Sequence, residues 1–372
     1  MKKTIYFVPA PQIENTGDLL INKATLDAVR PYGQIVVCDH KTPKWFVDEI
    51  ADESDGRLSE ESGIGFYPFL YWQALCALWG GGHCYLILPP GHMSRDGVKK
   101  ALGNCVIYLN LCFLRLLGLR IVRAGFTIGP FDKINAWIES FGSMAFYYYG
   151  VRDAESYDLA RRYYFSHLDL IPDMAWSYMP HVDNAQLAKD YVVVSFRSNS
   201  YGILHDPQYL LPIRRRLRTL LANPALASLR IVVAYQVKYD RDACLEIVRD
   251  LEADFSVELI DHKLSLSEAD ALYAGASCVI TNRLHVLLLA SQNDTLALAL
   301  VDKEDNKKIT SILADNALTD VVLDLKDDER DALASVSTAL ASGVDIVARF
   351  KAARERNKIL IKSEFSRLFS AP

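Results

Sequence analysis

The chain has 372 residues, of which 51% are hydrophobic and 23% are charged, and its formal net charge is −5. This length and apolar content indicate a globular protein with room for two domains of ordinary size. The acidic balance argues against a general nucleic-acid binder, whose surface would be basic, and residues 1–12 hold too few apolar side chains for a signal peptide or an anchor, so we expect a cytoplasmic protein.

Strands and helices are predicted to alternate along the chain, which favours parallel sheets covered by helices. In the first half, apolar runs predict strands at residues 4–8, 34–38, 120–124 and 145–151. Helices are expected at residues 19–29 and 106–117, and a triple glycine within residues 79–90 predicts a tight loop.

A second series of elements begins near Tyr191. The same patterns predict strands at residues 192–196, 229–234, 257–259 and 278–280. Helices are expected at residues 207–221, 240–251 and 267–274. Residues 173–189, which contain a proline, form the most plausible linker between the two series.

We therefore predict an α/β protein with two Rossmann-like domains that face each other across a cleft, an architecture of the GT-B type. The expected domains are residues 1–180, residues 181–330 and a helical extension at residues 331–372. In open α/β sheets ligands bind at the loops beyond the carboxyl ends of the strands. All the motifs considered below are expected in such loops.

The segment at residues 278–290, CVITNRLHVLLLA, is the most informative one. A strand is expected to end at Ile280, Thr281 and Asn282 are predicted to cap a helix, and Arg283 and His285 would lie in its first turn. Unpaired backbone N–H groups and the helix dipole attract anions there, and a guanidinium adds a fork for phosphate or carboxylate. Alternatively, Arg283 pairs with a nearby carboxylate and His285 is a half-buried structural histidine.

Seven short motifs occur in order: Asn15-Thr16-Gly17-Asp18, Gly80-Gly81-Gly82, GFTIGP at residues 125–130, Val151-Arg152-Asp153 with Ser156, Pro172-Asp173, Val194-Ser195-Phe196-Arg197 and Arg283-Leu284-His285. They resemble the N-x-G-D turn, glycine run, G-x-x-I-G-P loop, V-R-D-x-x-S, P-D, V-S-x-R and R-L-H motifs of the polysaccharide pyruvyl transferases. The resemblance spans roughly residues 5 to 320.

The resemblance implies a reaction between phosphoenolpyruvate and two hydroxyls of a sugar, which gives a cyclic pyruvate ketal and phosphate. It implies that Arg197, Arg283, Leu284 and His285 bind the donor, with Arg283 and His285 catalytic. His285 is the candidate proton-transfer group, as general acid or as general base. Taken alone, Arg197 would be interpreted as a solubility device on an edge strand.

The first domain is expected to hold the acceptor sugar. Asp18 and His83 could bind hydroxyls, while Gly81 and Gly82 would let a ligand approach the backbone. Asp18 could instead cap the helix that follows it, and the glycines could serve only a turn. Arg152 and Asp153 are interpreted as an internal ion pair that braces a loop.

Phosphoenolpyruvate is expected as a co-substrate, with no further cofactor. The seven cysteines include no CxxC pair and the eight histidines form no cluster with ligand spacing, so neither a disulfide framework nor a metal site is predicted. The expected acceptor is a sugar or a lipid-linked oligosaccharide, and nucleic acid is not an expected partner. Two alternatives stay open: a GT-B glycosyltransferase with a nucleotide-sugar donor, and an inactive sugar-binding member of the family.

Two features suggest peripheral contact with a membrane, at the inner face of the cytoplasmic membrane. Residues 67–79 and 106–119 are strongly apolar but too short or too interrupted to span a bilayer, so they are core helices or an interfacial patch. Residues 349–367 form a basic amphipathic helix that either rests on an anionic bilayer or packs back across the first domain.

Overall fold

The computed structural model describes residues 3–10, 13–61, 63–80, 82–180, 189–199 and 205–370. The chain forms two compact units. Unit 1 comprises residues 1–13, 21–178 and 357–372, and unit 2 comprises residues 14–20 and 179–356. The chain passes between them after Tyr178, inside the predicted linker, of which residues 181–188 lie outside the described residues.

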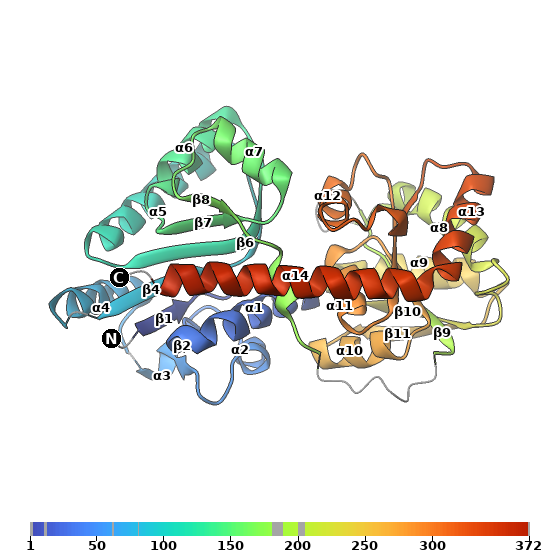
Figure 1. Ribbon diagram of the computed structural model, residues 1–372, viewed down its shortest axis with the longest axis horizontal. Coiled ribbons are helices and arrows are strands. Elements are labelled where there is room, and N and C mark those ends of the chain that lie inside the picture. Colours follow the sequence, from blue (N-terminus) through green and yellow to red (C-terminus); the bar gives the residue numbers. More distant parts are fainter. Residues whose placement is uncertain are drawn as a thin grey trace. The chain divides into compact units, whose positions relative to one another are not determined.

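Unit 1 is built on a parallel sheet of eight strands in the order β3-β2-β1-β4-β6-β7-β8, with β5 paired to β6 (Figure 1). Its strands are β1 (Lys3–Phe7), β2 (Gln34–Val37), β3 (Gly56–Arg57), β4 (His83–Leu88), β5 (Gly91–Arg95), β6 (Arg120–Phe131), β7 (Tyr148–Val151) and β8 (Leu168–Leu170). The helices are α1 (Thr16–Val29), α2 (Lys44–Ile50), α3 (Leu58–Glu61), α4 (Phe66–Gly80), α5 (Val98–Leu116), α6 (Lys133–Ser143) and α7 (Ala154–Arg162).

Unit 2 contains a parallel sheet of six strands in the order β11-β10-β9-β12-β13-β14. The strands are β9 (Tyr191–Ser195), β10 (Arg230–Tyr235), β11 (Val257–Lys263), β12 (Cys278–Thr281), β13 (Leu296–Val301) and β14 (Val322–Asp324). The helices are α8 (Pro207–Leu221), α9 (Arg241–Leu251), α10 (Leu266–Ala274), α11 (Leu284–Gln292), α12 (Lys307–Asp315), α13 (Glu329–Ala341) and α14 (Gly343–Ser370). Short 3-10 turns occur at Arg30–Tyr32, Met174–Ser177, Lys238–Asp240 and Thr319–Val321.

The predicted class, α/β with two Rossmann-like domains, is confirmed by these two parallel sheets. The central strands β12 and β13 are buried along their whole length, as expected where helices cover both faces of a parallel sheet. Most strands predicted from the sequence lie within one or two residues of an observed one. The strand expected at residues 145–151 starts later, at Tyr148, because the chain first turns after α6 through bonds such as Ala145 N–H to Gly142 O.

The helical extension predicted at residues 331–372 is not a separate body. Helix α14 is a single helix of 28 residues (Figure 1). Its residues up to Arg356 belong to unit 2, and those from Asn357 belong to unit 1. In unit 1 its buried side chains include Ile361, Phe365 and Phe369. The Phe369 ring stacks on Tyr32 at a centroid distance of 5.1 Å. This segment therefore packs onto the first domain, which was one of the two alternatives for the basic tail.

Within the described ranges, no single helix is both long enough and apolar enough to cross a membrane. Helices α13 and α14 meet these criteria only as a pair, and the chain bends by 73° between them.

Candidate active site

The carboxyl edge of the unit 2 sheet brings together the two arginines singled out in the sequence. The strand order turns in opposite directions on either side of β9 and β12, which makes the crevice between these two strands the switch point where ligands of such sheets bind. Ser195 and Thr281 are paired in register at the ends of the two strands, and the Thr281 hydroxyl donates to Ser195 O at 2.6 Å. Arg197 and Arg283 each follow two residues later and therefore flank the switch point.

Thr281 and Asn282 hold the two arginine backbones in place. The Thr281 hydroxyl accepts the Arg283 N–H at 2.9 Å, and Asn282 Oδ1 accepts the Arg197 N–H at 2.8 Å. Asn282 Nδ2 in turn donates to the Tyr209 hydroxyl at 3.0 Å. The predicted cap at Thr281 and Asn282 is therefore wrong. Arg283 occupies the N-cap position of α11, and the two polar residues before it connect β9 to β12.

The guanidinium of Arg283 is paired with Asp240, whose side chain is almost fully buried. Arg283 Nη2 donates to Asp240 Oδ1 at 2.6 Å, and Arg283 Nε donates to Asp240 Oδ2. Burial raises the pKa of the Asp240 carboxyl above its ordinary value, while Arg283 and, more weakly, Arg197 oppose the rise. The alternative in which Arg283 pairs with a carboxylate is thus what the structure shows.

Asp240 is a site residue that the sequence reasoning missed. It lies at the end of a short turn after β10, which is the neighbour of β9 on the side away from β12. The sequence contains a pattern that could have identified Asp240, because a carboxylate a few residues beyond a buried parallel strand belongs to the ligand-binding edge of the sheet. The side chain of Arg197 lies within electrostatic reach of it and donates from Nε to Asn199 O at 2.5 Å. Both guanidiniums therefore act electrostatically on the same carboxylate, Arg283 through its hydrogen bonds and Arg197 more weakly.

His285, in the first turn of α11, lies against the Asn15-Thr16-Gly17-Asp18 turn. A Cβ placed on Gly17 would lie 2.6 Å from His285 Nδ1, so only glycine permits this approach. The turn is fastened to the same sheet edge, because Thr16 N–H donates to Gln236 O at 3.0 Å and the Thr16 hydroxyl donates to Leu264 O. This explains why residues 14–20 belong to unit 2 although they precede most of unit 1 in the sequence.

Asp18 is therefore placed differently from its prediction. It belongs to unit 2 with His285 rather than to the first domain. It does not cap a helix at residue 19, because α1 begins at Thr16 and Asn15 Oδ1 accepts the Gly17 N–H at 2.9 Å, as an N-cap does. Asn15 Nδ2 also donates to Asp18 Oδ1 at 3.3 Å. Asp18 thus lies in the turn that meets His285 through Gly17, in the same unit as the two arginines.

The glycine run lies elsewhere. Gly81 is outside the described residues, Gly80 ends α4, and Gly82 and His83 lie at the amino end of β4. The expectation that these residues lie beyond the carboxyl end of a strand is wrong, because the apolar run after them is itself the strand. A role for Gly82 and His83 in acceptor binding stays a prediction, and their position at the amino edge argues against it.

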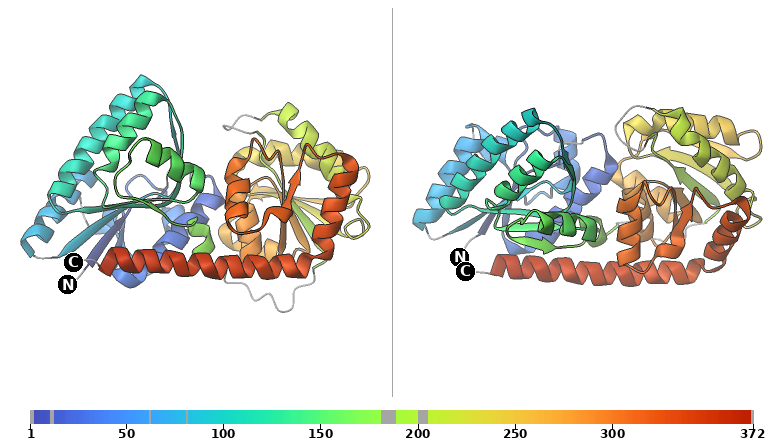
Figure 2. Two further views of the ribbon diagram at one scale, coloured as in Figure 1. Left: turned by 45° about the horizontal axis from the view of Figure 1, so that its top comes forward. Right: turned by 90° about the horizontal axis from the view of Figure 1, so that it is seen from above.

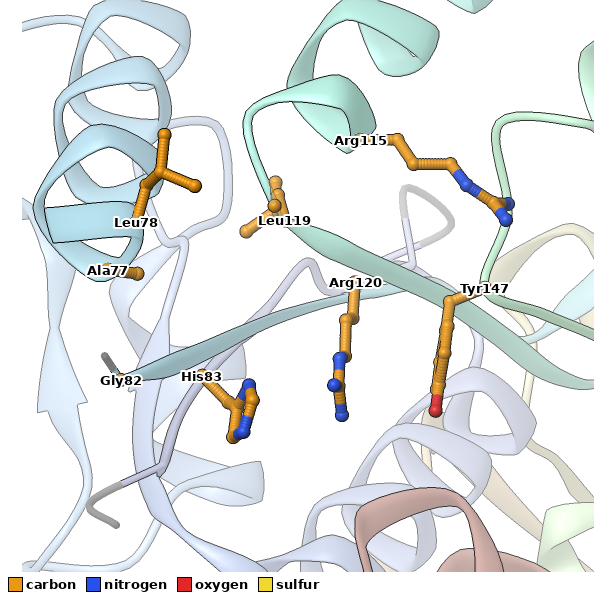
Figure 3. Close-up of a pocket in the computed structure, with 9 residues that line it drawn as sticks. Ala77, Leu78, Gly82, His83, Arg115, Leu119, Arg120 and Tyr147 are labelled. Atoms are coloured by element: carbon orange, nitrogen blue, oxygen red, sulfur yellow. The ribbon is translucent and has the colours of Figure 1, made fainter. Parts of the chain in front are cut away.

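A cavity of about 430 Å³ opens at this amino edge, where α4 and α5 end (Figure 3). It is lined by His83, Arg115, Arg120, Tyr147 and the apolar Leu78 and Leu119, among others. His83, Arg120 and Tyr147 project to the same side of the strands in Figure 3. Burial, followed by the charge of Arg120, lowers the pKa of His83.

The remaining motifs are joined to one another in unit 1 by an ion pair and hydrogen bonds. Arg152 forms a buried ion pair with Asp173 and donates from Nε to the Thr127 hydroxyl at 2.8 Å. Asp153 accepts that hydroxyl at 2.7 Å and caps α7 through the Ser156 N–H at 2.7 Å. The predicted ion pair between Arg152 and Asp153 is therefore wrong. Three family-like motifs instead bond to one another across the ends of β6 and β7.

In the part of the chain that the structure describes, no group of three or more histidine, cysteine, aspartate or glutamate side chains is placed to hold a metal ion.

Comparison with known proteins gives one family. The family model for polysaccharide pyruvyl transferase matches residues 15–300. A search of curated proteins finds no match.

Several solved structures share the fold at low identity. A glycosyltransferase from Rickettsia africae matches with a TM-score of 0.60 and 9% identity over 100% of both chains. A putative UDP-N-acetylglucosamine 2-epimerase from Listeria monocytogenes matches with a TM-score of 0.57 and 10% identity, over 99% of this chain and 98% of that one. The UDP-GlcNAc 2-epimerase from Neisseria meningitidis matches with a TM-score of 0.54 and 8% identity, over 94% of each chain. At these identities the likeness supports the GT-B-like fold alone.

Proposed function

The chain belongs to the polysaccharide pyruvyl transferase family, and we propose that it transfers the pyruvyl group of phosphoenolpyruvate to two hydroxyls of a sugar in a polysaccharide or its lipid-linked precursor. The product would be a pyruvate ketal, and inorganic phosphate would be released. The observation that carries the proposal is the convergence of Arg197, Arg283 and His285 at the switch point of unit 2.

The charge at this edge suits a donor with two anionic groups. Asp240 accepts two of the five N–H donors of Arg283, so the guanidinium is held in a fixed orientation with donors left for a ligand. Arg197 adds a second guanidinium near the same carboxylate. The backbone N–H groups at the start of α11 supply further donors and a positive dipole end. We propose that this set binds the phosphate and the carboxylate of phosphoenolpyruvate, with Asp240 as a positioning residue.

The proposed reaction requires two proton movements. One sugar hydroxyl loses its proton as its oxygen adds to the central carbon of the enol, and a proton is delivered to the methylene carbon. The bond from the central carbon to the phosphate oxygen then breaks, and its electron pair leaves with phosphate. The oxygen of the second hydroxyl bonds to the central carbon and closes the ketal, and its proton passes to the released phosphate. His285 is the group we assign to proton transfer, because an imidazole works in either direction near neutral pH.

The acceptor would approach from the side of the Asn15–Asp18 turn. Asp18 directly follows Gly17, whose backbone lies against the His285 ring, and a carboxylate can bind the hydroxyls of a sugar. Donor and acceptor groups would then meet at His285. The reaction as written requires no cofactor beyond phosphoenolpyruvate as a co-substrate.

The test is release of inorganic phosphate from phosphoenolpyruvate in the presence of a panel of glycan acceptors, with mass spectrometry of the products. We expect release that depends on the acceptor and a glycan heavier by one ketal-linked pyruvyl group. Nucleotide release from UDP-sugars with the same acceptors, and none of phosphate from phosphoenolpyruvate, would replace this proposal by that of a glycosyltransferase. Activity with neither donor would point to an inactive sugar-binding member.

A further inference from the structure

Three helices of unit 1 present large apolar side chains to solvent. Of the twenty-four large hydrophobic residues that are exposed among those described, fourteen lie on α4, α5 and α6. They are Tyr67, Trp72, Leu78, Trp79, Val98, Leu102, Val106, Ile107, Leu109, Phe113, Leu116, Ile134, Trp137 and Phe141. We call this surface the α4–α6 face. Helices α5 and α6 run side by side in both views of Figure 2, and Tyr71 of α4 bonds to Asn110 of α5 at 2.9 Å.

Helix α5 is apolar on two sides. One side is buried in unit 1 through Ala101, Tyr108, Leu111 and Leu114. On the other, Leu102, Val106, Leu109, Phe113 and Leu116 recur every three or four residues and form an exposed stripe. No charged residue interrupts the helix between Lys100 and Arg115. Packing within unit 1 therefore explains only a minority of the apolar residues of α5.

Unit 2 provides an internal comparison, since it has the same fold class. Its described residues include only three exposed large hydrophobics, Met179, Tyr239 and Val344. Single exposed apolar residues of that kind are ordinary for a protein surface, whereas a contiguous apolar patch marks an interaction site. The α4–α6 face is thus a local feature of unit 1 and not a general property of this chain.

The charges carried by the face have one sign. Its exposed charged residues are Lys99 and Lys100 on α5 and Lys133 on α6, with Arg115 half-buried at the end of α5. The acid within these helices, Glu139, is fully buried. Asp96 and Asp132 lie in the loops that precede α5 and α6, and Asp132 is engaged there as the cap of α6. A cationic face on a chain of net charge −5 indicates an anionic partner.

We propose that the α4–α6 face rests on an anionic lipid bilayer. Apolar side chains would enter the boundary between headgroups and acyl chains, and the lysines would contact anionic headgroups. Trp72, Trp79 and Trp137 suit that boundary, where tryptophan is enriched. A second copy of the chain fits less well, because pairing this face with itself would bring lysines of like charge together. The membrane contact is therefore assigned to these helices rather than to the tail.

The experiment measures binding of the full chain to sedimented vesicles, without substrates. Vesicles of phosphatidylcholine alone are compared with vesicles that also contain phosphatidylglycerol, at low and at high salt. We expect binding to the anionic vesicles that weakens as salt increases, because surface attraction is screened. The double variant Leu109→Glu/Phe113→Glu should lose at least tenfold in binding. Val344→Glu, which changes an exposed apolar residue of unit 2, is the matched control and should bind like the unchanged chain.

Folding and self-association are checked on the same samples. Circular dichroism should show an unchanged fold in all variants, because every substituted residue is exposed. Lys99→Glu/Lys100→Glu should reduce the salt-sensitive part of the binding without touching the apolar stripe. Equal binding to neutral and anionic vesicles, or none to either, would overturn the proposal. So would a dimer in analytical ultracentrifugation that the α5 double variant dissociates. Neither result bears on the proposed transferase activity, because the assay contains no substrate.

Discussion

At the scale of single residues, the site depends on how one buried carboxylate is shared. Asp240 is desolvated, and the two N–H donors that Arg283 gives it keep the guanidinium in one orientation. Because Arg197 lies near the same carboxylate, two guanidiniums are positioned at this edge before any ligand arrives. Such preorganised charge costs little reorganisation when an anion binds.

The arginines can be tested through donor affinity. Replacing Arg197 or Arg283 by alanine should weaken phosphoenolpyruvate binding by about 2 to 4 kcal/mol, the scale for removing one partner of a desolvated charge pair. Arg283→Lys should stay impaired, because a point charge cannot replace the planar fork. Titration calorimetry measures the affinity. The control is Arg214→Ala, which removes an arginine of α8 that forms an ion pair with Glu246. Unchanged affinity in both alanine variants would remove these residues from the site.

His285 is tested by separating turnover from binding. If it transfers protons, His285→Ala should lower turnover by roughly 100- to 10,000-fold with little change in donor affinity. His285→Gln should be almost as inactive, because an amide cannot exchange protons near neutral pH. The measurement is acceptor-dependent phosphate release at saturating phosphoenolpyruvate. Turnover close to that of the unchanged enzyme in the glutamine variant would leave protonation by the donor phosphate as the better mechanism.

At the scale of elements, the start of α1 belongs to a different unit from most of its length. Asn15 pairs with Val237 in an antiparallel bridge, and Thr16 bonds to Gln236 beyond β10. The helix then continues into unit 1 from Ile21. The turn is held this way because Gly17 lacks a side chain at the point where it meets the His285 ring. The position of Asp18 therefore depends on a glycine one residue before it.

Gly17→Ala tests this contact. The added methyl group would overlap His285 Nδ1, so the turn and the imidazole must move apart. We expect a loss of about 1 to 3 kcal/mol in the free energy of unfolding, the usual cost of overpacking, and reduced turnover. Gly103→Ala is the matched control, because that position on α5 has open space around it, and it should be neutral or slightly stabilising. Urea unfolding measures the free energy of unfolding of both variants. Equal stability of the two would argue against a close approach of Gly17 to His285.

At the scale of the whole molecule, the last helix completes the core of unit 1. Phe369 packs against Tyr85 at a centroid distance of 4.6 Å as well as against Tyr32, and Phe365 lies beside it. Ile359 and Leu360, earlier in the same helix, remain exposed. A sequence that reads as a basic amphipathic tail is thus a core helix on one side. Removing it would uncover apolar surface of the first domain.

Phe369→Ala should destabilise unit 1 by about 3 to 5 kcal/mol, the cost of deleting a buried phenyl ring and leaving a cavity. Ile359→Ala, on the exposed side of the same helix, should change stability by no more than about 0.5 kcal/mol. Denaturant unfolding followed by tryptophan fluorescence measures both. Two variants of equal stability would show that the C-terminal turns do not pack onto the sheet.

The sequence by itself determined the fold class and the positions of most strands, because apolar runs bounded by turn residues are local patterns. It also singled out Arg283 and His285 from their place after a strand, and Arg197 from the family resemblance, as candidate site residues. Runs without such boundaries were harder to assign. The strand that follows the glycine run was not predicted, so Gly82 and His83 were placed at the wrong edge of the sheet.

Only the tertiary structure decided which groups meet. The pairing of Arg283 with Asp240 joins residues 43 positions apart, and the contact of Gly17 with His285 joins two motifs at opposite ends of the family-like region. Neither can be read from spacing along the chain, because the order of strands within a sheet brings distant loops to one edge. The same holds for α5: its second apolar side was visible in the sequence, but whether that side faces the core or solvent depends on which neighbours cover it.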